Sequence, residues 1–576
     1  MQKKLRSQRW FWGANETGLL HRGALRSSGI EMDNYHGQPV IGIANTWGEI
    51  NNCNMSLRSV AEEVKKGIRE AGAIPLEFPV ITLGEEMMKP TAGLYRNLLS
   101  IDVEENLRAY PFDGVVLLGN CDKTVPGLLM GAVSANLPCI QLNAGPKKAG
   151  IHKGRRLGSG TDLWKYWDEL RTGKIDEAEW EEIGKQLSCG FGGCNTMGTS
   201  STMNGVLEAV GIMPLGLSTL AVDSDERSKM VRAAGRRIVE MVQEDLKPSD
   251  ILTVSAFRNA VAVCMAVGGS TNAVLHLTAI AGRLNISLYP EIFNELGTIV
   301  PCIANVQPSG ERLIDEFNDA GGIPAVMKVL DDIINVNAIT YTGKPLRELL
   351  KDVQVLDNNV IKKIDVPVTP VPTLAILRGN LAPGGAVIKV AAASPGLLKH
   401  KGRAFVFENY EAMLCHIDDE SLPVDASTVL ILRNAGPKAV PGMPEWGMIP
   451  IPKKLRKLGV DDMVRISDAR MSGTSYGTVV LHVVPEAGIG GPLALVKTGD
   501  EITLDIEKRE LSVNISDVEM ASRKSNWKIP AIVHKRGYPK LFIREVLQAD
   551  EGCDFDFLKP RAAEDLSFIE PIVGRS

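Results

Sequence analysis

The stretch GVVLLGNCDKTVPGLLMGA at residues 114–132 decides the fold. Its first five residues form a short, continuous apolar run that ends in a polar turn, which is typical of a strand buried on both faces. Pro126 then stands where the first turn of a helix tolerates proline, because that position needs no backbone N–H donor. The order strand, turn, helix predicts one unit of an α/β layer with a mainly parallel sheet.

Short apolar runs alternate with helical patterns on both sides of this stretch, over residues 40–350. Residues 56–71 predict an amphipathic helix, because their apolar side chains recur at helical spacing. The stripe consists of Leu57, Val60, Ala61, Val64, Ile68 and Ala71. We therefore expect an N-terminal α/β domain with a mainly parallel sheet over residues 1–370.

The pattern changes from about residue 365. Three prolines in IDVPVTPVPT, residues 364–373, are typical of an extended linker. Strand-like runs such as GRAFVFEN and STVLILRN follow, and the alternation in TLDIEKRELSVNI, residues 503–515, predicts a hairpin. We expect residues 371–576 to form a β-rich C-terminal domain, either barrel-like or a sandwich.

The composition argues against several classes of protein. The 64 basic and 69 acidic residues give a net charge of −5, which offers no electrostatic reason to expect nucleic acid or an anionic membrane as partner. No uncharged apolar run approaches the about 18–20 residues of a membrane span, and the basic N-terminal stretch lacks the apolar core of a signal peptide. Nine thinly spread cysteines suit a reduced, cytoplasmic protein.

A charged segment at residues 162–188 contains Trp164, Trp167 and Trp180. It could be a helical excursion that covers a site. The composition favours the plainer interpretation, a surface helix pair with aromatic anchors.

Three cysteines, Cys53, Cys121 and Cys194, lie in polar loops that lead into predicted helices. The positive end of a helix favours thiolate over thiol, and thiolates bind iron and zinc. Cys139 and Cys264 lie in apolar runs and are expected in the core. The intervals between the three cysteines are far longer than in a compact Cys-x-x-Cys motif, so spacing alone does not identify a metal site.

The sequences around these cysteines are more specific. They form a series with other motifs: ANTWGEINNCN, GNCDKTVPGLLMGA, GGCNTMGTSSTM, GGSTNAVLHL, GPKAVPGMPEWG and SDARMSGTSYGTVVLHVVPEA. In this order, from residue 44 to residue 487, they resemble the family that comprises dihydroxyacid dehydratase, phosphogluconate dehydratase and the sugar-acid dehydratases. The resemblance covers nearly the whole chain.

This resemblance implies an iron–sulfur cluster, usually 2Fe-2S, held by Cys53, Cys121 and Cys194. Three protein ligands leave one iron position open for substrate, as in other catalytic metal sites. Cys189, five residues before Cys194, is the alternative ligand. The sequence does not decide between a 2Fe-2S and a 4Fe-4S cluster.

The resemblance also implies a magnesium ion beside the cluster. Its ligands would be Glu85, Asp122, Glu445 and Lys123, the last as a carbamate, because an ammonium group cannot coordinate a cation. Glu86 is the alternative to Glu85 if the alignment shifts by one place.

The string RMSGTSYG matches the motif that holds the family's catalytic serine, here Ser472, with Thr474 two residues on. Ser475 is the alternative base, and an ordinary Gly-Ser-Thr turn is the alternative interpretation of the whole string. Candidates for substrate contact carry weaker signals: Ser270, Thr271, Asn272, His276, His482 and Lys438.

The function that the resemblance implies is dehydration of a 2,3-dihydroxy carboxylate to a 2-keto-3-deoxy acid by a hydro-lyase. RMSGTSYG and CNTMGTSSTM are more similar to the sugar-acid branch, which favours an aldonate such as arabinonate, xylonate or galactonate. Dihydroxyacid dehydratase and then phosphogluconate dehydratase are the alternatives within the family. A non-catalytic iron–sulfur sensor and a zinc protein are alternatives from other classes. The resemblance also implies a homodimer or homotetramer.

Overall fold

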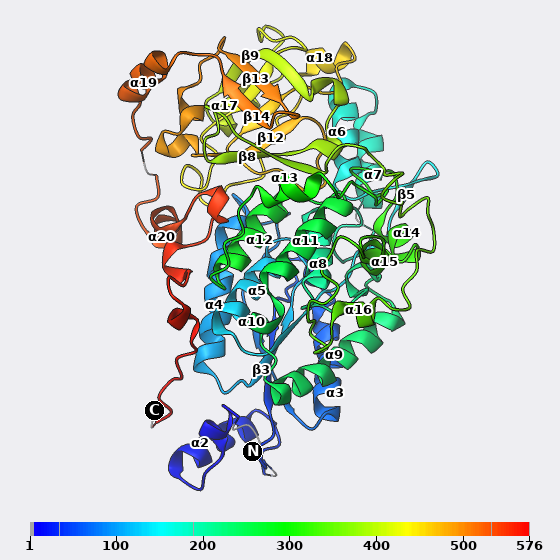
Figure 1. Ribbon diagram of the computed structural model, residues 1–576, viewed down its shortest axis with the longest axis vertical. Helices are drawn as coiled ribbons and strands as arrows, with labels where there is room; N and C mark the ends of the chain where they lie inside the picture. The colour runs from blue at the N-terminus through cyan, green and yellow to red at the C-terminus, as the bar shows by residue number, and fades with distance from the viewer. Residues whose placement is uncertain (1–4, 34, 188, 532, 575–576) are drawn as a thin grey trace.

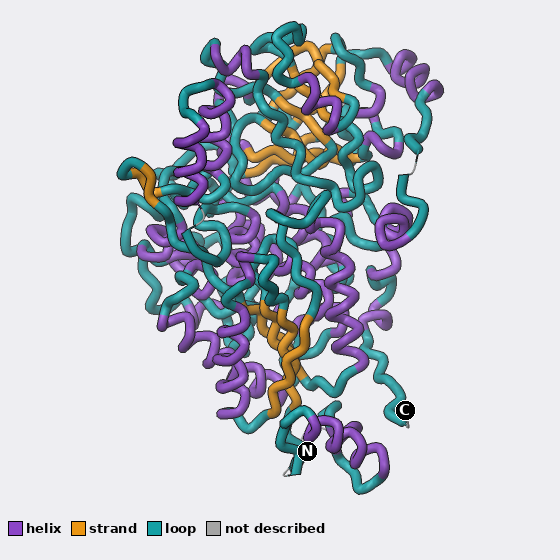
Figure 2. The backbone as a smooth tube through the Cα atoms, turned by 180° about the vertical axis from the view of Figure 1, so that it is seen from behind, coloured by secondary structure: helices purple, strands orange, loops and turns teal. Residues whose placement is uncertain are grey.

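The computed structural model describes residues 5–33, 35–187, 189–531 and 533–574. The two larger β-sheets lie at different heights along the long axis, and most of the helices surround the lower sheet and the region between the two (Figures 1 and 2). The short helices α1 (Gln8–Phe11) and α2 (Glu16–Ser27) form the lower end.

The lower sheet has four strands, and all of them are parallel. Their order is β2 (Ile74–Pro79), β1 (Val40–Asn45), β3 (Gly114–Leu118) and β4 (Cys139–Leu142). The crossover helices are α3 (Leu57–Glu70), α4 (Arg96–Ala109) and α5 (Thr124–Ala135). The structure thus confirms the mainly parallel sheet, and α3 buries the predicted stripe from Leu57 to Ile68.

After β4 the chain becomes helical, and the alternation expected up to residue 350 stops at Leu142. Over the described part of residues 143–350, the only strands are the two-residue β5 (Ile151–His152) and β6 (Arg155–Arg156). The apolar runs around Cys264 and His276 are helices, α11 and α12, which are buried almost all round. A continuous apolar run suits a buried strand and a buried helix equally, which explains the difference. The helices of this region are α6 (Thr161–Thr172), α7 (Glu177–Leu187), α8 (Thr199–Ala209), α9 (Asp225–Glu244), α10 (Pro248–Ile251), α11 (Val254–Ala266), α12 (Asn272–Gly282), α13 (Ile292–Gly297), α14 (Ile314–Asp319), α15 (Gly322–Val329) and α16 (Leu346–Leu349).

The upper sheet has eight strands in the order β14-β13-β9-β10-β11-β12-β8-β7. Its edges meet, because Arg378, directly after β7, donates to the carbonyl of Arg509 and accepts from Leu511 of β14, each at 2.8 Å. The C-terminal sheet is therefore barrel-like and not a sandwich, and β13 and β14 form the predicted hairpin. Its strands are β7 (Leu374–Leu377), β8 (Gly385–Lys389), β9 (Lys399–Phe407), β10 (Val429–Leu432), β11 (Arg465–Ser467), β12 (Val479–Val484), β13 (Glu501–Asp505) and β14 (Glu510–Val513); its helices are α17 (Tyr410–His416), α18 (Lys453–Lys457) and α19 (Asp517–Asn526).

The last part of the chain returns to the helical region. Helix α20 (Gly537–Glu545) and the residues after it run down beside α4 (Figure 1). Phe542 and Phe555 pack in one cluster with Leu94 and Leu275. Asp554, directly before Phe555, accepts two hydrogen bonds from the guanidinium of Arg283 at the C-terminal end of α12, at 2.5 and 2.9 Å. Both side chains are fully buried. A buried ion pair therefore fastens the C-terminal segment.

Replacing Asp554 with alanine is expected to destabilise the protein by about 3–5 kcal/mol, because buried Arg283 would lose both hydrogen bonds to its nearest carboxylate and keep only Glu104, at 3.7 Å. The midpoint of urea denaturation measures this change. The matched control is Asp556→Ala, since the Asp556–Arg561 pair is exposed on both sides and should contribute less than about 1 kcal/mol. Equal, small shifts in both variants would contradict the fastening role of Asp554.

The described part of the segment at residues 162–188, which leaves out Ser188, is the helix pair α6 and α7. Trp167 and Trp180 pack together with ring centroids 5.8 Å apart, so they join the two helices. The start of α6 reaches the upper half, where the Thr161 hydroxyl donates to the carbonyl of Thr474 at 3.0 Å.

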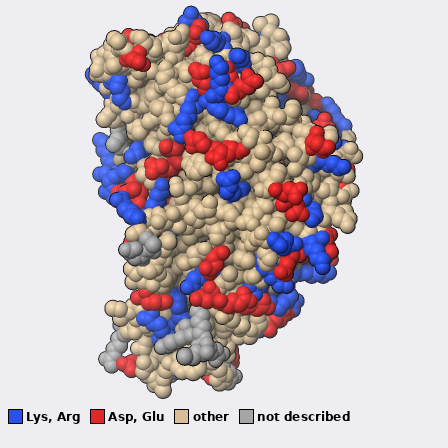
Figure 3. Space-filling view, viewed as in Figure 1, with Lys and Arg blue, Asp and Glu red and all other residues tan. Residues whose placement is uncertain are grey.

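The surface carries charges of both signs. On the face that Figure 3 shows, acidic and basic side chains lie intermingled, with large areas of neither sign between them. Among the described residues, no helix combines the length and the apolar character needed to cross a lipid bilayer.

Candidate active site between the two sheets

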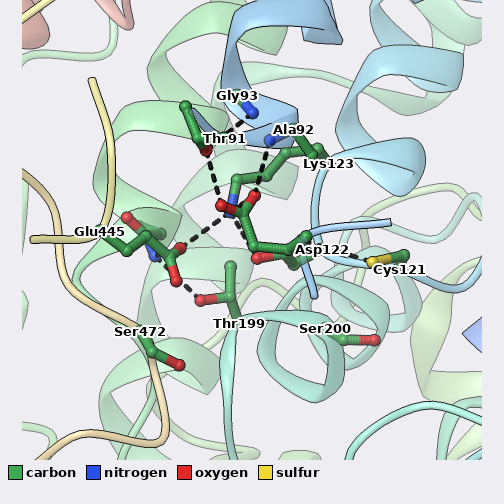
Figure 4. A network of polar contacts seen from close by, with 12 residues as sticks. Thr91, Ala92, Gly93, Cys121, Asp122, Lys123, Thr199, Ser200, Glu445 and Ser472 are labelled. Carbon is green, nitrogen blue, oxygen red and sulfur yellow. Dashed lines mark hydrogen bonds and ion pairs between the residues drawn. The ribbon is translucent and has the colours of Figure 1, made fainter. Parts of the chain in front are cut away.

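Three carboxylates surround one buried lysine. Oxygen atoms of Glu85, Asp122 and Glu445 lie within 4.8 Å of one another. The Nζ of Lys123 lies 2.8 Å from Glu445 Oε1 and 3.3 Å from Glu85 Oε2, and it also contacts Asp122 (Figure 4). The structure thus brings together all four residues that the sequence suggested for magnesium, with Glu85 and not the exposed Glu86 facing the lysine.

The topology explains why residues so far apart in sequence meet here. Cys53, Glu85 and the Cys121–Lys123 turn follow β1, β2 and β3, which are neighbouring parallel strands. Carboxyl ends of parallel strands share one edge of a sheet, and sites in α/β proteins form at that edge. Glu445 and Ser472 follow β10 and β11, which are neighbouring parallel strands of the upper sheet. The site therefore lies where two such edges face each other.

The ionisation of the cluster follows from burial and from the neighbouring charges. Burial and the nearby Arg470 act to lower the pKa of Lys123, but the three carboxylates outweigh them and raise it. Burial also raises the pKa of Glu85. For Glu445 burial acts in the same direction, but Lys123 and Arg470 prevail and lower its pKa. The lysine is thus a cation that compensates the carboxylates.

Arg470 is a member of the site that the sequence analysis missed. It donates to Glu445 Oε1 at 2.9 Å, to the Thr91 hydroxyl at 3.0 Å and to the carbonyl of Met443 at 2.7 Å. Thr91 in turn donates to Glu85 at 2.6 Å. Arg470 therefore links two carboxylates of the cluster. Its signal in the sequence is a charged residue between a buried strand and a Gly-Ser loop.

The loops of Cys53 and Cys121 are tied together next to the carboxylates. The Asn54 side chain accepts from the backbone N–H groups of Asn120 and Cys121, each at 3.2 Å, and Asn120 donates to the carbonyl of Cys53 at 2.9 Å. The Cys53 and Cys121 thiols also hydrogen-bond to each other, and Cys121 contacts Asp122 at 3.5 Å. Cys194 lies near the same groups, because Cys121 and Asp122 are among those that raise the pKa of its thiol.

The protonation of these thiols corrects the expectation that the helix ends favour thiolate. The hydrogen bond with Cys53, burial and Asp122 all raise the pKa of Cys121 well above its usual value. Burial raises the pKa of Cys194 to about 11. Both shifts favour the thiol form of Cys121 and Cys194, so a metal that binds to them must displace their protons.

The other cysteines lie elsewhere. Cys189, the alternative ligand, is exposed, and its Sγ contacts only groups of helix α7, the Lys185 carbonyl at 3.9 Å and the Gln186 side chain at 3.7 Å, among the hydrogen bonds described. Cys139 and Cys264 are in the core as expected, where burial raises the pKa of each thiol to about 12.

The serine loop, residues 470–477, packs closely against helix α8. Gly473 lies against the start of α8, where a Cβ atom would come within 2.5 Å of Thr199 N. The hydroxyls of Ser472 and Thr474 are 2.9 Å apart. Ser472 itself is partly exposed and lies on the same side of the cluster as Glu445 and Thr199 (Figure 4). A helix N-terminus carries partial positive charge, so this placement favours an anionic oxygen.

Comparison with known proteins identifies the family of this chain. The family model for the N-terminal part of dihydroxy-acid/6-phosphogluconate dehydratases matches residues 38–349, and the C-terminal model matches residues 359–553. The chain belongs to this dehydratase family. It is thus a hydro-lyase. Among its relatives are an L-arabonate dehydratase of Azospirillum brasilense, 48% identical over 96% of this chain and 97% of the relative, and an L-arabinonate dehydratase of Rhizobium leguminosarum, 47% identical over 97% and 96%. A 6-deoxy-6-sulfo-D-gluconate dehydratase of Pseudomonas putida is 46% identical over 97% of both chains.

The GGSTN loop of this dehydratase supports the carboxylate cluster. Asn272 donates to Glu445 at 3.1 Å and to the Met471 carbonyl at 3.0 Å. The Ser270 hydroxyl lies 2.9 Å from that of Thr199. The loop therefore connects α8, Glu445 and the serine loop.

The remaining candidates make no hydrogen bond to the three carboxylates of the candidate site among the described contacts. His276 Nδ1 lies 3.1 Å from Arg96, and burial lowers its pKa well below the usual value. Burial and Arg470 lower the pKa of His482 to about 3. Lys438 donates its backbone N–H to Glu486, and the Thr271 hydroxyl is buried without a partner among the described residues.

A pocket of about 250 Å³ borders Glu445. Trp164 and Trp167 of α6 form one wall, and Tyr410, Trp446 and Tyr476 belong to the others. Helix α6 of the 162–188 segment therefore lines the pocket beside Glu445. Trp167 and Trp180 also join α6 to α7, as expected of a helix pair with aromatic anchors.

Proposed function

We propose that this enzyme removes water from an aldonic acid, a 2,3-dihydroxy carboxylate, to give a 2-keto-3-deoxy acid, and that it depends on an iron–sulfur cluster and magnesium. The observation that carries the proposal is the convergence of two donor sets with a base: three carboxylates around Lys123, the linked Cys53 and Cys121 loops, and Ser472. The sugar acids in the names of the relatives support the substrate class.

The carboxylate cluster fits magnesium in the chemistry of its donors, since Mg²⁺ prefers oxygen ligands. It also fits in charge. A carbamate carries one negative charge and Mg²⁺ two positive charges, so together they add one positive charge, as the Lys123 ammonium does now. Carbamylation joins carbon dioxide to the amine and releases two protons from the ammonium form. We therefore propose Glu85, Asp122, Glu445 and carbamylated Lys123 as the magnesium ligands.

The cysteine set fits an iron–sulfur cluster in the softness of its donors. We propose Cys53, Cys121 and Cys194 as the three ligands of a 2Fe-2S cluster. When bound, the cluster and magnesium would supply Lewis acidity to the departing 3-hydroxyl and to the carboxylate and 2-hydroxyl of the substrate.

The residues of the chain would then move one proton. Ser472 Oγ, as an alkoxide, takes the proton from C2, while Thr474 and the start of α8 stabilise its negative charge. Arg470 and Asn272 hold Glu445 in place. Loss of the C2 proton and of the 3-hydroxyl as water leaves an enol, which tautomerises to the keto acid.

We also propose that residues 1–370 and 371–576 are the two domains, so that the site lies at their junction. In this division the first domain contributes the cysteines and most of the magnesium ligands, and the second contributes Ser472, Thr474 and Glu445. We propose that the enzyme works in the cytoplasm, as its thinly spread cysteines suggest. As the resemblance implies, we propose that it forms a homodimer or homotetramer.

The test is an aldonic-acid panel that includes 6-phosphogluconate and 2,3-dihydroxyisovalerate, with 2-keto acid formation as the readout. We expect a brown protein that acts fastest on a pentonate or hexonate, that loses activity on treatment with EDTA and that regains it with Mg²⁺. Exclusive turnover of 2,3-dihydroxyisovalerate would instead identify a dihydroxyacid dehydratase. A brown protein with no keto acid from any substrate would indicate a sensor, and a colourless protein a zinc site.

A further inference from the structure

The pocket beside Glu445 is lined by two residues whose buried polar atoms have no partner among the described residues. The Ser475 side chain is 1% exposed, and its hydroxyl makes no hydrogen bond within the described chain. The indole N–H of Trp164 is also buried without a partner there. Both residues line the pocket that Glu445 borders. Buried polar groups are normally hydrogen-bonded, so two unpaired ones in one pocket point to a ligand that completes them.

The charged groups of the same pocket are already engaged. Arg465 is the only cationic residue of its described wall, and it donates to Asp462 at 2.8 Å and to the Ile449 carbonyl at 3.1 Å. Asp168 pairs with Arg171 at 2.9 Å, and Asp461 pairs with Arg456 at 2.6 Å. The pocket therefore offers free hydrogen-bonding capacity to neutral groups, and its one cation is already taken.

The rest of the wall is aromatic. The rings of Tyr410 and Trp446 are stacked, with centroids 4.3 Å apart and an angle of 16° between their planes. Trp167 and Tyr476 complete a surface that suits the C–H groups of an extended carbon chain. A ligand with alternating C–H and hydroxyl groups matches both features of this pocket.

We propose that this pocket binds the uncharged polyol tail of the substrate, from C4 onward, with Ser475 Oγ and Trp164 Nε1 hydrogen-bonded to its hydroxyl groups. This inference rests on the proposed function, because Glu445, which borders the pocket, then marks the end where the substrate carboxylate binds. It assigns specificity, and not chemistry, to Ser475 and Trp164. It also defines the substrate more narrowly, as an aldonate whose terminal carbon bears a hydroxyl and not a phosphate or a sulfonate.

The decisive experiment compares two substrates that differ only in the tail: a pentonate and the stereochemically matched 2,3-dihydroxypentanoate, which lacks the 4- and 5-hydroxyls. In the iron-loaded enzyme, Ser475→Ala should lower kcat/KM for the pentonate about 3- to 10-fold, the value of one neutral hydrogen bond. The same variant should leave kcat/KM for 2,3-dihydroxypentanoate unchanged. Trp164→Phe, which keeps an aromatic wall and removes the N–H donor, should give the same selective loss.

Stability provides a second readout. Because the Ser475 hydroxyl has no partner in the part of the chain that the structure describes, Ser475→Ala should leave the thermal midpoint unchanged or raise it. The matched control is Ser218→Ala, which removes another buried hydroxyl without a described partner, far along the chain from the pocket residues. This variant should leave kcat/KM unchanged for both substrates. Equal losses on both pentanoates would overturn the tail subsite and indicate a structural role for Ser475.

A comparison of substrates with neutral and anionic tails tests the inference independently. Wild-type enzyme should use gluconate with a kcat/KM about tenfold or more above that for 6-phosphogluconate or 6-deoxy-6-sulfogluconate, since an anionic tail would be buried without a free cation. Faster turnover of either anionic substrate would overturn the inference. If wild-type enzyme dehydrates none of these acids, the proposed function fails and takes the subsite with it. Turnover of the pentonate with unselective variants overturns the subsite alone.

Discussion

Ser472→Ala should lower kcat for the best aldonate by about 10²–10⁴-fold, the usual contribution of a positioned general base. The substitution removes one oxygen from a loop whose backbone is set by Gly473 against the start of α8, so the fold and the metal ligands should remain. The visible absorbance of the iron–sulfur cluster should therefore match that of the wild type. Single-turnover formation of 2-keto acid measures the effect without interference from product release.

The neighbouring serine supplies the comparison for this variant. Ser475→Ala changes the same loop but is expected to lower kcat/KM for the pentonate only about 3- to 10-fold, as the loss of one hydrogen bond to the substrate would. If Ser475→Ala has the larger effect and Ser472→Ala retains near-normal turnover, the base is Ser475 and the assignment of Ser472 is wrong.

Cys121→Ser should lose the cluster and the activity together. A serine hydroxyl is a hard, weakly acidic donor and a poor replacement for a thiolate on iron. Cys121 also lies between Cys53 and Asp122, so its loss should affect both donor sets. We expect iron and acid-labile sulfide per chain to fall to background, with turnover below detection.

The control for this variant is Cys189→Ser. Cys189 is exposed and its contacts are with α7, so this variant should keep its iron and its activity. Iron retained in Cys121→Ser but lost in Cys189→Ser would reverse the assignment of the ligands.

The sequence predicted the parts of the fold that depend on local pattern. The strand, turn and helix of residues 114–132 became β3, the Cys121–Lys123 turn and α5, and the alternation at residues 503–515 became the hairpin of β13 and β14. Helices α11 and α12 were ambiguous, because burial all round removes the 3.6-residue periodicity that distinguishes a helix from a strand. The closure of the barrel through Arg378 depends on a pairing across more than a hundred residues, which no local pattern encodes.

The candidate site followed the same division. The four residues proposed for magnesium are together, since motif resemblance carries long-range information that spacing does not. The thiolate prediction was wrong for Cys121 because it considered only the helix end. Burial and a nearby carboxylate depend on the tertiary structure and prevail over the helix dipole. Arg470 went unnoticed for a similar reason, since its partners lie in loops distant in sequence.

The residues proposed for the reaction and those proposed for substrate specificity come largely from different sheets. Cys53 and Cys121 lie in loops of the parallel sheet, whereas most walls of the pocket beside Glu445 come from the C-terminal barrel-like region, and helix α6 forms the remaining wall. Changes in those walls can therefore alter which acid fits while the loops that would hold the metals stay as they are. With such an arrangement, related enzymes can keep the same reaction while they evolve to act on different sugar acids.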